Sequence, residues 1–255
     1  MRFLFLHAHP DDETLVSGSL ILALRRLGQE CLVLTATRGE QGGPNPPADP
    51  QALASRRLAE RAQALAELGA VDAGFLGCSP NREPGRSGRR YGDSGMAWVT
   101  ATVAGPSRHA PTNALSRAPL PEVATDVAQA IQHWRPDLLV SYDRHGGYCH
   151  PDHIRCHHAM VAAARLTGLP WAQIVHSPDH LGRGVPDPQA ATQATWFEAG
   201  VDHDRLLAAH SCYASQFKLT ERGVLHVGGQ IDPLQTRLGL WPYPPDWPAE
   251  PAQAA

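Results

Sequence analysis

The 255-residue chain predicts an α/β fold in which helices flank a mostly parallel sheet. Three observations support this class: short apolar runs alternate with segments of helical spacing, glycines follow the helices, and loops rich in Gly and Pro separate the segments. Because helices connect successive apolar runs, parallel strands with right-handed crossovers are expected. The prediction is therefore a Rossmann-like sheet over most of the chain, followed by an irregular C-terminal part.

Each expected element follows from its local pattern. Strands are predicted at residues 3–7, 31–37, 71–76, 137–142 and 171–175. Helices are predicted at residues 13–27, 51–68, 122–134, 151–166 and 202–217. Residues 77–121 are dense in Gly, Pro, Ser and Arg, which is typical of a long loop that is functional or disordered. Residues 1–240 are expected to form one domain, and the Pro-rich residues 241–255 a tail.

Composition excludes several classes of protein. The net charge of −3 and the pI near 6.5 give no basis for nucleic-acid binding. The five cysteines are odd in number and include no CxxC, which indicates a reducing compartment rather than a disulfide framework. The chain has no signal-peptide core and no apolar run of the roughly 18 residues that a membrane helix needs. A cytoplasmic protein without a membrane partner is expected, and monomer and homo-oligomer both stay open.

A cluster of polar residues follows the first predicted strand. His9, Asp11, Asp12 and Glu13 lie where this strand ends and a helix begins, the position at which open α/β sheets bind ligands. Three acids could simply favour the positive end of the helix dipole. However, His is a poor N-cap residue, and three acids exceed what capping needs. We therefore expect His9 and Asp12 to point at one cation and Asp11 to be free for proton transfer.

A second motif follows a later strand. His150 and His153 lie three residues apart, and Pro151 marks a helix start. Parallel strands end at the same edge of a sheet, so this motif can converge with residues 9–12. Two histidines and one carboxylate are typical of catalytic zinc, which lowers the pKa of a bound water from about 15.7 to about 7. The predicted ligands are His9, Asp12 and His153.

These two motifs resemble a known family. His7-Ala-His-Pro-Asp-Asp-Glu13 and Gly146-Gly-Tyr-Cys-His-Pro-Asp-His153 are similar to the motifs of the LmbE-like/PIG-L family of zinc-dependent N-acetylglucosamine deacetylases. The resemblance covers most of residues 1–166, and within the family the chain looks most like mycothiol-pathway deacetylases, which act on N-acetylglucosaminyl-inositol. It implies hydrolysis of the acetamide of a small amino-sugar conjugate, with Zn²⁺ as the cofactor and Fe²⁺ able to substitute.

The resemblance also implies roles for individual residues. Asp11 would be the base that deprotonates the metal-bound water and later the donor of a proton to the leaving amine. His150, oriented by Asp152, would stabilise the oxyanion, and Tyr148 would close over the substrate. The substrate contacts that it implies are Arg57, Asp93 and, within the 37–40 motif, Arg38.

Some residues depart from the pattern or stand outside it. Cys149 occupies a family glycine position and could be a packing substitution, an oxidation-sensitive thiol or a soft ligand. Trp98 could stack on a sugar ring, whereas His176 and His180 are interpreted as loop residues. Four arginines in the long loop are either a solvated surface or a site for an anionic aglycone: Arg82, Arg86, Arg89 and Arg90.

Two other functions and several details stay open. The chain could be a sugar-binding paralogue without activity, although the intact set of polar residues weighs against this. It could also hydrolyse another amide or ester bond, but phosphoester hydrolysis often uses two metals and the sequence offers ligands for one. The aglycone (inositol, malate or another group) and the physiological metal are not determined by the sequence.

Overall fold

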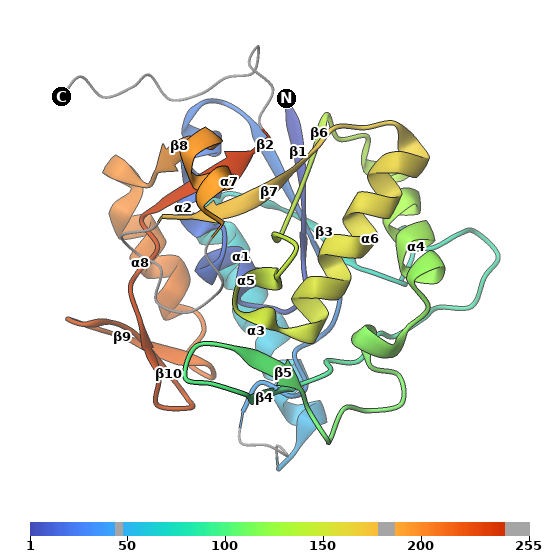
Figure 1. Cartoon of the computed structure of the whole chain (residues 1–255), viewed down its shortest axis with the longest axis horizontal. Coiled ribbons are helices and arrows are strands. Elements are labelled where there is room, and N and C mark those ends of the chain that lie inside the picture. Colours follow the sequence, from blue (N-terminus) through green and yellow to red (C-terminus); the bar gives the residue numbers. More distant parts are fainter. Residues whose placement is uncertain (44–47, 178–186, 243–255) are drawn as a thin grey trace.

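A seven-stranded sheet forms the centre of the protein (Figure 1). The computed structural model describes residues 1–43, 48–177 and 187–242. The strand order is β3-β2-β1-β6-β7-β12-β8; β3 to β7 pair in parallel, and β12 is antiparallel to both neighbours. The strands are β1 (Arg2–His7), β2 (Glu30–Thr35), β3 (Val71–Phe75), β6 (Leu138–Ser141), β7 (Trp171–His176), β8 (Thr195–Glu198) and β12 (Arg237–Trp241). The predicted mostly parallel α/β class is confirmed.

Helices cover both faces of this sheet. In β1, Phe3 and Phe5 pack into one core while Leu4 and Leu6 pack into the other, which explains the uninterrupted apolar run of this strand. The phenylalanine face is covered by α2 (Gly18–Arg26), α3 (Pro50–Leu68) and α8 (His203–Ser211). The leucine face is covered by α4 (Leu120–Trp134) and α6 (Pro151–Thr167), which lie side by side in Figure 1.

The predicted helix at 13–27 is two helices, α1 (Asp12–Leu15) and α2. The helix breaks at Ser17, whose backbone is not helical and whose hydroxyl donates to the carbonyl of Glu13 at 3.1 Å. The same hydroxyl lies 2.9 Å from Nε2 of the buried His7. This break keeps α1 to a single turn, so its acidic residues stay at the end of β1. Gly28 follows α2 with φ 74°, as predicted for a residue that ends a helix.

The long segment 77–121 is ordered rather than a structureless loop. It contains the hairpin of β4 (Met96–Trp98) and β5 (Ala104–Pro106) and the short helix η1 (Leu115–Arg117). Tyr91 anchors it, fully buried, with its hydroxyl donating to Asp126 of α4 at 2.7 Å. This contact fixes the start of the segment on α4. The β4–β5 hairpin that follows lies at the end of the sheet where the polar motifs lie.

The predicted helix at 202–217 ends early. After α8 the chain forms a three-stranded antiparallel sheet of β9 (Phe217–Thr220), β10 (Gly223–His226) and β11 (Ile231–Asp232). Tyr213 and Phe217 pack with Ala64 and Val224 in a small separate core. This packing requires the chain to leave the helix after Ser211. The remaining elements are α7 (Pro188–Gln193) and η3 (Gly200–Asp202).

The predicted tail starts inside an element, because Trp241 ends β12. Residues 243–255 of that tail, and His180, lie outside the described residues. Among the helices that the structure describes, none combines the length and apolar character needed to cross a bilayer.

Candidate metal centre and active site

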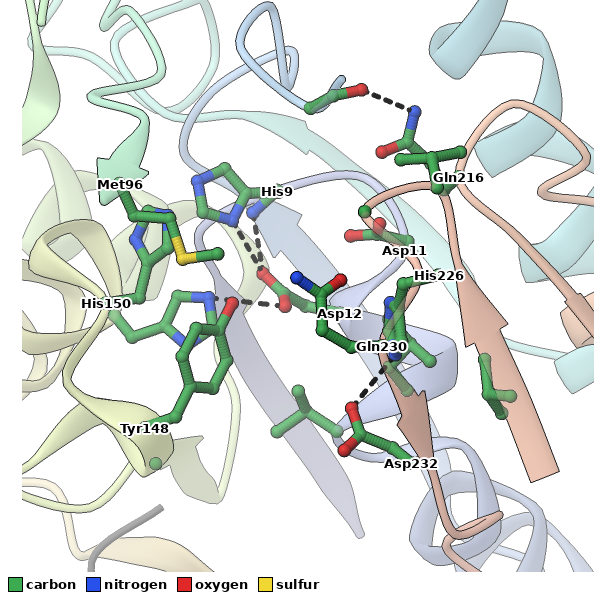
Figure 2. A pocket seen from close by; sticks show the side chains of 18 of the residues that line it. His9, Asp11, Asp12, Met96, Tyr148, His150, Gln216, His226, Gln230 and Asp232 are labelled. Carbon is green, nitrogen blue, oxygen red and sulfur yellow. Dashed lines mark hydrogen bonds and ion pairs between the residues drawn. The ribbon is translucent and has the colours of Figure 1, made fainter. Parts of the chain in front are cut away.

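The two polar motifs meet at the carboxyl ends of β1 and β6. These strands are neighbours, and their following helices pack on opposite faces of the sheet, so the motifs flank the point where the strand order reverses. A cavity of about 500 Å³ opens there, within the usual range for small-molecule sites (Figure 2). The position that the sequence predicted for the site is therefore a formed cavity.

The three predicted ligands lie next to one another. Asp12 Oδ2 lies 3.3 Å from His9 Nδ1, and Asp12 Oδ1 lies 3.4 Å from His153 Nε2. All three side chains are at least nine-tenths buried. Tetrahedral zinc with bonds of about 2.0–2.1 Å holds its ligand atoms about 3.3 Å apart, so each spacing suits a pair of ligands. The two histidines face different oxygens of Asp12, and the three residues are not among the groups of described side chains whose ligand atoms all lie within 4.8 Å of one another. Although burial raises the pKa of Asp12, His153 and His9 outweigh it and hold this pKa well below its usual range.

The hydrogen bonds of His153 leave one ring nitrogen for a metal. Nδ1 lies 3.2 Å from the carbonyl of Gly146, whereas Nε2 is buried, has no hydrogen-bond partner and faces Asp12. A histidine that donates from one nitrogen to a backbone carbonyl and presents the other is the usual arrangement of a metal ligand. The unpaired Nε2 is the observation that best fits a cation at this point.

The carboxylate of Asp152 contacts the ring of His9. This carboxylate accepts from the backbone N–H of Ser94 at 2.8 Å and from the Ser94 hydroxyl, and it lies 3.2 Å from His9 Nε2. His9 is thereby held with its Nδ1 toward Asp12, as carboxylates hold ligating histidines. The resemblance implied that Asp152 orients His150; the Asp152 backbone N–H donates to His150 Nδ1 at 3.1 Å, while its carboxylate contacts His9.

His150 ends the loop before α6 and caps that helix. Its Nδ1 accepts the backbone N–H of Asp152 at 3.1 Å, so a neutral His150 carries its proton on Nε2. Burial, together with the neighbouring His9 and His153, holds the pKa of His150 well below its usual range. In this tautomer His150 presents an N–H from Nε2, whereas its other tautomer would leave Nε2 free to join His9 and His153 as a ligand.

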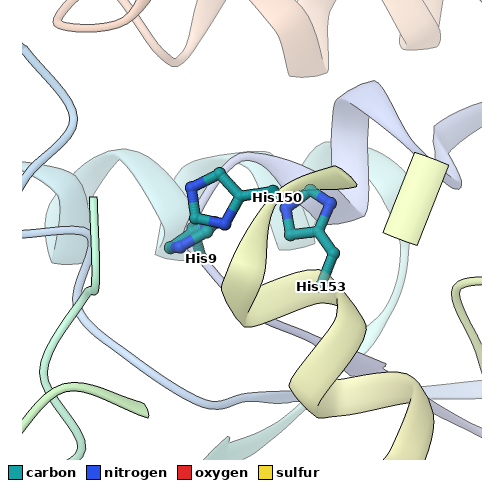
Figure 3. Close-up of side chains that lie close together, drawn as sticks. All are labelled: His9, His150 and His153. Atoms are coloured by element: carbon teal, nitrogen blue, oxygen red, sulfur yellow. The ribbon is translucent and has the colours of Figure 1, made fainter. Parts of the chain in front are cut away.

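Two overlapping groups of side chains could hold a cation among the described residues. The three histidines of Figure 3 place one ring nitrogen each within 4.8 Å of one another, as do the ligand atoms of His9, Asp93 and Asp152. Both groups contain His9. In addition, Asp93 already accepts backbone N–H groups from Gln41 at 3.0 Å and Gly95 at 2.8 Å. This arrangement suits one metal centre rather than two.

Asp11 lies on the other side of this centre, held in an unusual backbone conformation. Its φ is 116°, and its N–H donates to the buried Glu13 at 3.1 Å, while Glu13 also accepts from the Tyr213 hydroxyl. Arg57 from α3 approaches its carboxylate at 2.8 Å. Burial raises the pKa of Asp11 to about 8, in spite of the Arg57 guanidinium. A buried carboxyl with a raised pKa is a capable proton acceptor.

Arg57→Met is expected to lower the free energy of unfolding by about 3 kcal/mol, because it leaves the buried Asp11 without its partner. The lost side chain also donates to the carbonyls of Gly39, at 2.9 Å, and Pro10. Urea unfolding of the purified variants measures this. Arg56→Met is the control, since Arg56 is adjacent and 58% exposed, and its partner Glu60 also accepts hydrogen bonds from Ser215. Equal stability of the two variants would contradict the role of Arg57.

The other implied substrate contacts divide into two groups. Tyr148, on the short helix α5 (Gly146–Cys149), and Asp93 both line the cavity. Arg38 is not among the described lining residues: its guanidinium packs over the ring of Phe75 at 4.2 Å. We therefore correct the expectation for Arg38, whose side chain is used in packing against β3.

The loop arginines do not form an anion site at the cavity. None of the four is among the described residues that line it, and each lies within salt-bridge distance of a carboxylate. The pairs are Arg82 with Asp126 and Glu122, Arg86 with Glu83, Arg89 with Glu122, and Arg90 with Glu40. Arg82 and Arg89 thus link the 77–121 segment to α4, and Arg90 links it to the loop after β2, whereas Arg86 pairs within the segment.

Cys149 is the last residue of α5 and lies in the left-handed region, with φ 68°. That conformation favours glycine, which explains why a glycine suits this position in the motif. Its thiol is not part of either cluster of ligand atoms found among the described residues, and burial raises its pKa, with a further contribution from Asp143. These observations favour a packing substitution over a soft ligand.

Sequence reasoning missed several residues of the site. The Tyr142 hydroxyl donates to Asp12 at 2.7 Å, and its ring stacks on His153 at 4.1 Å between centroids. The position of Tyr142 at the end of an apolar strand is the sequence feature that could have identified it as a site residue. His176, interpreted as a loop residue, ends β7 and lines the cavity. A C-terminal group lines it too: His210, Gln216, His226, Gln230, Asp232 and Gln235.

Comparison with known proteins finds similarity to a family model and to proteins named as deacetylases. It matches PIG-L, described as GlcNAc-PI de-N-acetylase, over residues 4–164. A Kineococcus radiotolerans protein named 1D-myo-inositol 2-acetamido-2-deoxy-alpha-D-glucopyranoside deacetylase is 40% identical over 169 residues, which are 65% of this chain and 45% of that protein. A protein of the same name from Thermomonospora curvata is 32% identical over 233 residues, 75% of this chain and 73% of its own length.

The chain spans about half the length of several of these curated relatives, from 45% to 58%. Among solved structures, a deacetylase in complex with teicoplanin superposes with a TM-score of 0.60 over 94% of this chain and 98% of that one. At 19% identity that likeness shows the fold alone. The family match covers more than half of the chain, including both polar motifs. The chain therefore belongs to the PIG-L family.

Proposed function

We propose that the protein hydrolyses the acetamide of an N-acetylglucosamine conjugate and releases acetate and a glucosamine amine. The observation that carries this proposal is the arrangement of one buried His-Asp-His set with a base, Asp11, and a neutral donor, His150, around a single cavity. The names of the relatives support an inositol conjugate as the substrate. An inactive sugar-binding paralogue would have no need of this complete set.

In this proposal His9, Asp12 and His153 hold zinc, although Fe²⁺ suits the same ligands. When bound, the metal supplies Lewis acidity toward a water molecule and the amide carbonyl. Asp11 takes the proton of the attacking water, and Nε2–H of His150 donates to the carbonyl oxygen as it gains charge. A carbon–oxygen bond forms, the carbon–nitrogen bond breaks, and Asp11 returns its proton to the leaving amine.

Other side chains position these groups. Arg57 is engaged with Asp11 and two backbone carbonyls, so we propose that it fixes the base rather than binding the sugar. Tyr148 lies beside the rings of His153 and Trp98, at 5.4 and 5.7 Å between centroids, where it could cover a bound sugar. Asp93 lines the cavity close to His9, with Oδ1 3.4 Å from Nε2, and is proposed as the sugar contact.

The reducing cytoplasm is the compartment that we propose for this reaction. All five cysteines lie within the described residues, and none forms a disulfide. Two of them, Cys31 and Cys156, are fully buried as small apolar side chains. Thiols that persist in this form fit a compartment that does not oxidise them.

Primary-amine release tests the proposed reaction. N-acetylglucosaminyl-inositol, the corresponding malate conjugate, chitobiose bearing the acetyl groups, and free N-acetylglucosamine are incubated with zinc-loaded enzyme. We expect release from the inositol conjugate, loss of release after chelation, and its return when zinc is added. Absence of release from every substrate, with one zinc bound per chain, would refute this function.

A further inference from the structure

The cavity has a second wall that the matched family region does not include. The β10–β11 hairpin follows residue 164, where the family match ends, and contributes His226, Gln230 and Asp232 to the lining. Figure 2 shows His226 and Asp232 on one side of the cavity and Tyr148 and His150 on the other. A group that occupied the metal centre would therefore extend toward side chains supplied by the C-terminal part.

This wall presents hydrogen-bonding groups in fixed positions. Across the antiparallel β10–β11 pair, His226 Nε2 lies 3.0 Å from Asp232 Oδ2, and the two side chains are 24% and 27% exposed. Further along, His176 Nδ1 lies 3.4 Å from Gln235 Oε1. These side chains hold one another in place while part of each faces the cavity. Such ordered polar groups determine the orientation of a ligand in an otherwise apolar pocket.

The two hairpins of the protein meet at this cavity. With the amide of Gln230 turned so that its oxygen faces Trp98, the indole Nε1 of Trp98 donates to it at 3.1 Å. Figure 1 shows the β4–β5 hairpin and β9–β10 at the same end of the molecule. Trp98 and Gln230 thus border the part of the cavity that lies away from the core of the sheet, where the conjugated group of a sugar would lie.

The charges of the lining disfavour an anionic ligand. Among the described residues that line the cavity, Arg57 is the one arginine, and there is no lysine. The Arg57 guanidinium is already engaged with Asp11 at 2.8 Å. The lining also contains Asp12, Asp93 and Asp232, whose side chains are acidic. A carboxylate or phosphate on the ligand would need a free guanidinium or ammonium here, and like charges would repel it.

We infer that the β10–β11 hairpin selects the aglycone. His226, Gln230 and Asp232 bind its hydroxyl groups, so a neutral, hydroxyl-rich aglycone is accepted and an anionic one is rejected. This inference rests on the proposed deacetylation and adds the residues that determine which conjugate is used. Loss of one such hydrogen bond from a buried site lowers selection about tenfold.

Asp232→Asn tests the inference in the zinc-loaded full chain. The measured quantity is the ratio of kcat/KM for N-acetylglucosaminyl-inositol to kcat/KM for free N-acetylglucosamine. We expect this ratio to fall about tenfold in Asp232→Asn and also in Gln230→Ala, a second variant at a partly exposed position. Glu221→Gln is the matched control, because Glu221 is exposed, belongs to the turn between β9 and β10, and is not among the described lining residues.

Three outcomes would overturn the inference. The ratio could stay unchanged in both variants, it could change equally in Glu221→Gln, or the wild type could prefer the malate conjugate over the inositol conjugate. If no conjugate is hydrolysed, the proposed reaction has failed, and calorimetric binding of N-acetylglucosaminyl-inositol decides the inference separately. Weaker binding to Asp232→Asn than to Glu221→Gln supports it, and equal binding refutes it.

Discussion

Asp11→Asn is expected to lower kcat by about 10³-fold while the protein keeps about one zinc per chain. An amide has nearly the shape of a carboxylate but cannot accept the proton of water, and general base catalysis contributes about 10² to 10⁴ in rate. Asp11 is held by Arg57, whereas His9 and His153 contact Asp12, so its replacement should leave the three predicted ligands in place. Amine release and zinc content are measured on the same preparation.

The control for this variant is Asp204→Asn. Asp204 is exposed in the first turn of α8 and undergoes the same change of acid to amide. It should keep both wild-type turnover and wild-type zinc content. If Asp11→Asn hydrolysed the substrate at a rate within a fewfold of the control, the proton would have another acceptor and the assignment of the base would be wrong.

The second large effect is expected from His153→Ala, which should lose most of its zinc on dialysis. Nε2 of His153 is the unpaired nitrogen that faces Asp12, and its removal leaves two protein ligands. Loss of a residue that merely supports a ligand weakens binding about 10- to 100-fold, so loss of a ligand itself should exceed that. Zinc per chain, determined by mass spectrometry after dialysis at fixed free zinc, measures the effect.

His158→Ala provides the matched comparison for zinc binding. His158 lies on the same helix, α6, but is exposed and contacts the ring of His157. The same deletion there should leave zinc content unchanged. Full zinc occupancy in His153→Ala would show that a different set, such as one that includes His150 in its other tautomer, holds the ion.

The sequence was sufficient to locate the site because the relevant signals are local. The apolar run of β1 predicts a strand. His9 and the acidic residues that follow predict a polar site at the end of that strand. The same holds for β6 and the motif with His150 and His153. Since parallel strands share an edge, two local patterns were enough to predict that distant residues converge.

The parts that were missed depend on contacts with no local pattern. Asp152 supports His9 only because Ser94, some 58 positions earlier in the chain, reaches its carboxylate. The sequence left open whether the arginines of the long loop form a solvated surface or an anion site, because their acidic partners are spread from Glu40 to Asp126. Likewise, the antiparallel strands that build the second wall pair through tertiary packing, so periodicity alone could not predict where they would lie.

If His150 is the proposed donor, the cap that it provides to α6 makes the proposed catalysis depend on a local folding equilibrium. The nitrogen that accepts the Asp152 N–H determines where the other proton sits, so the donor exists only while the first turn of the helix is formed. Fraying of that single turn would free the ring to change tautomer and would remove the donor without unfolding the domain. The residue at position 150 is therefore constrained twice, once by the helix and once by the reaction, and evolution cannot change one role without disturbing the other.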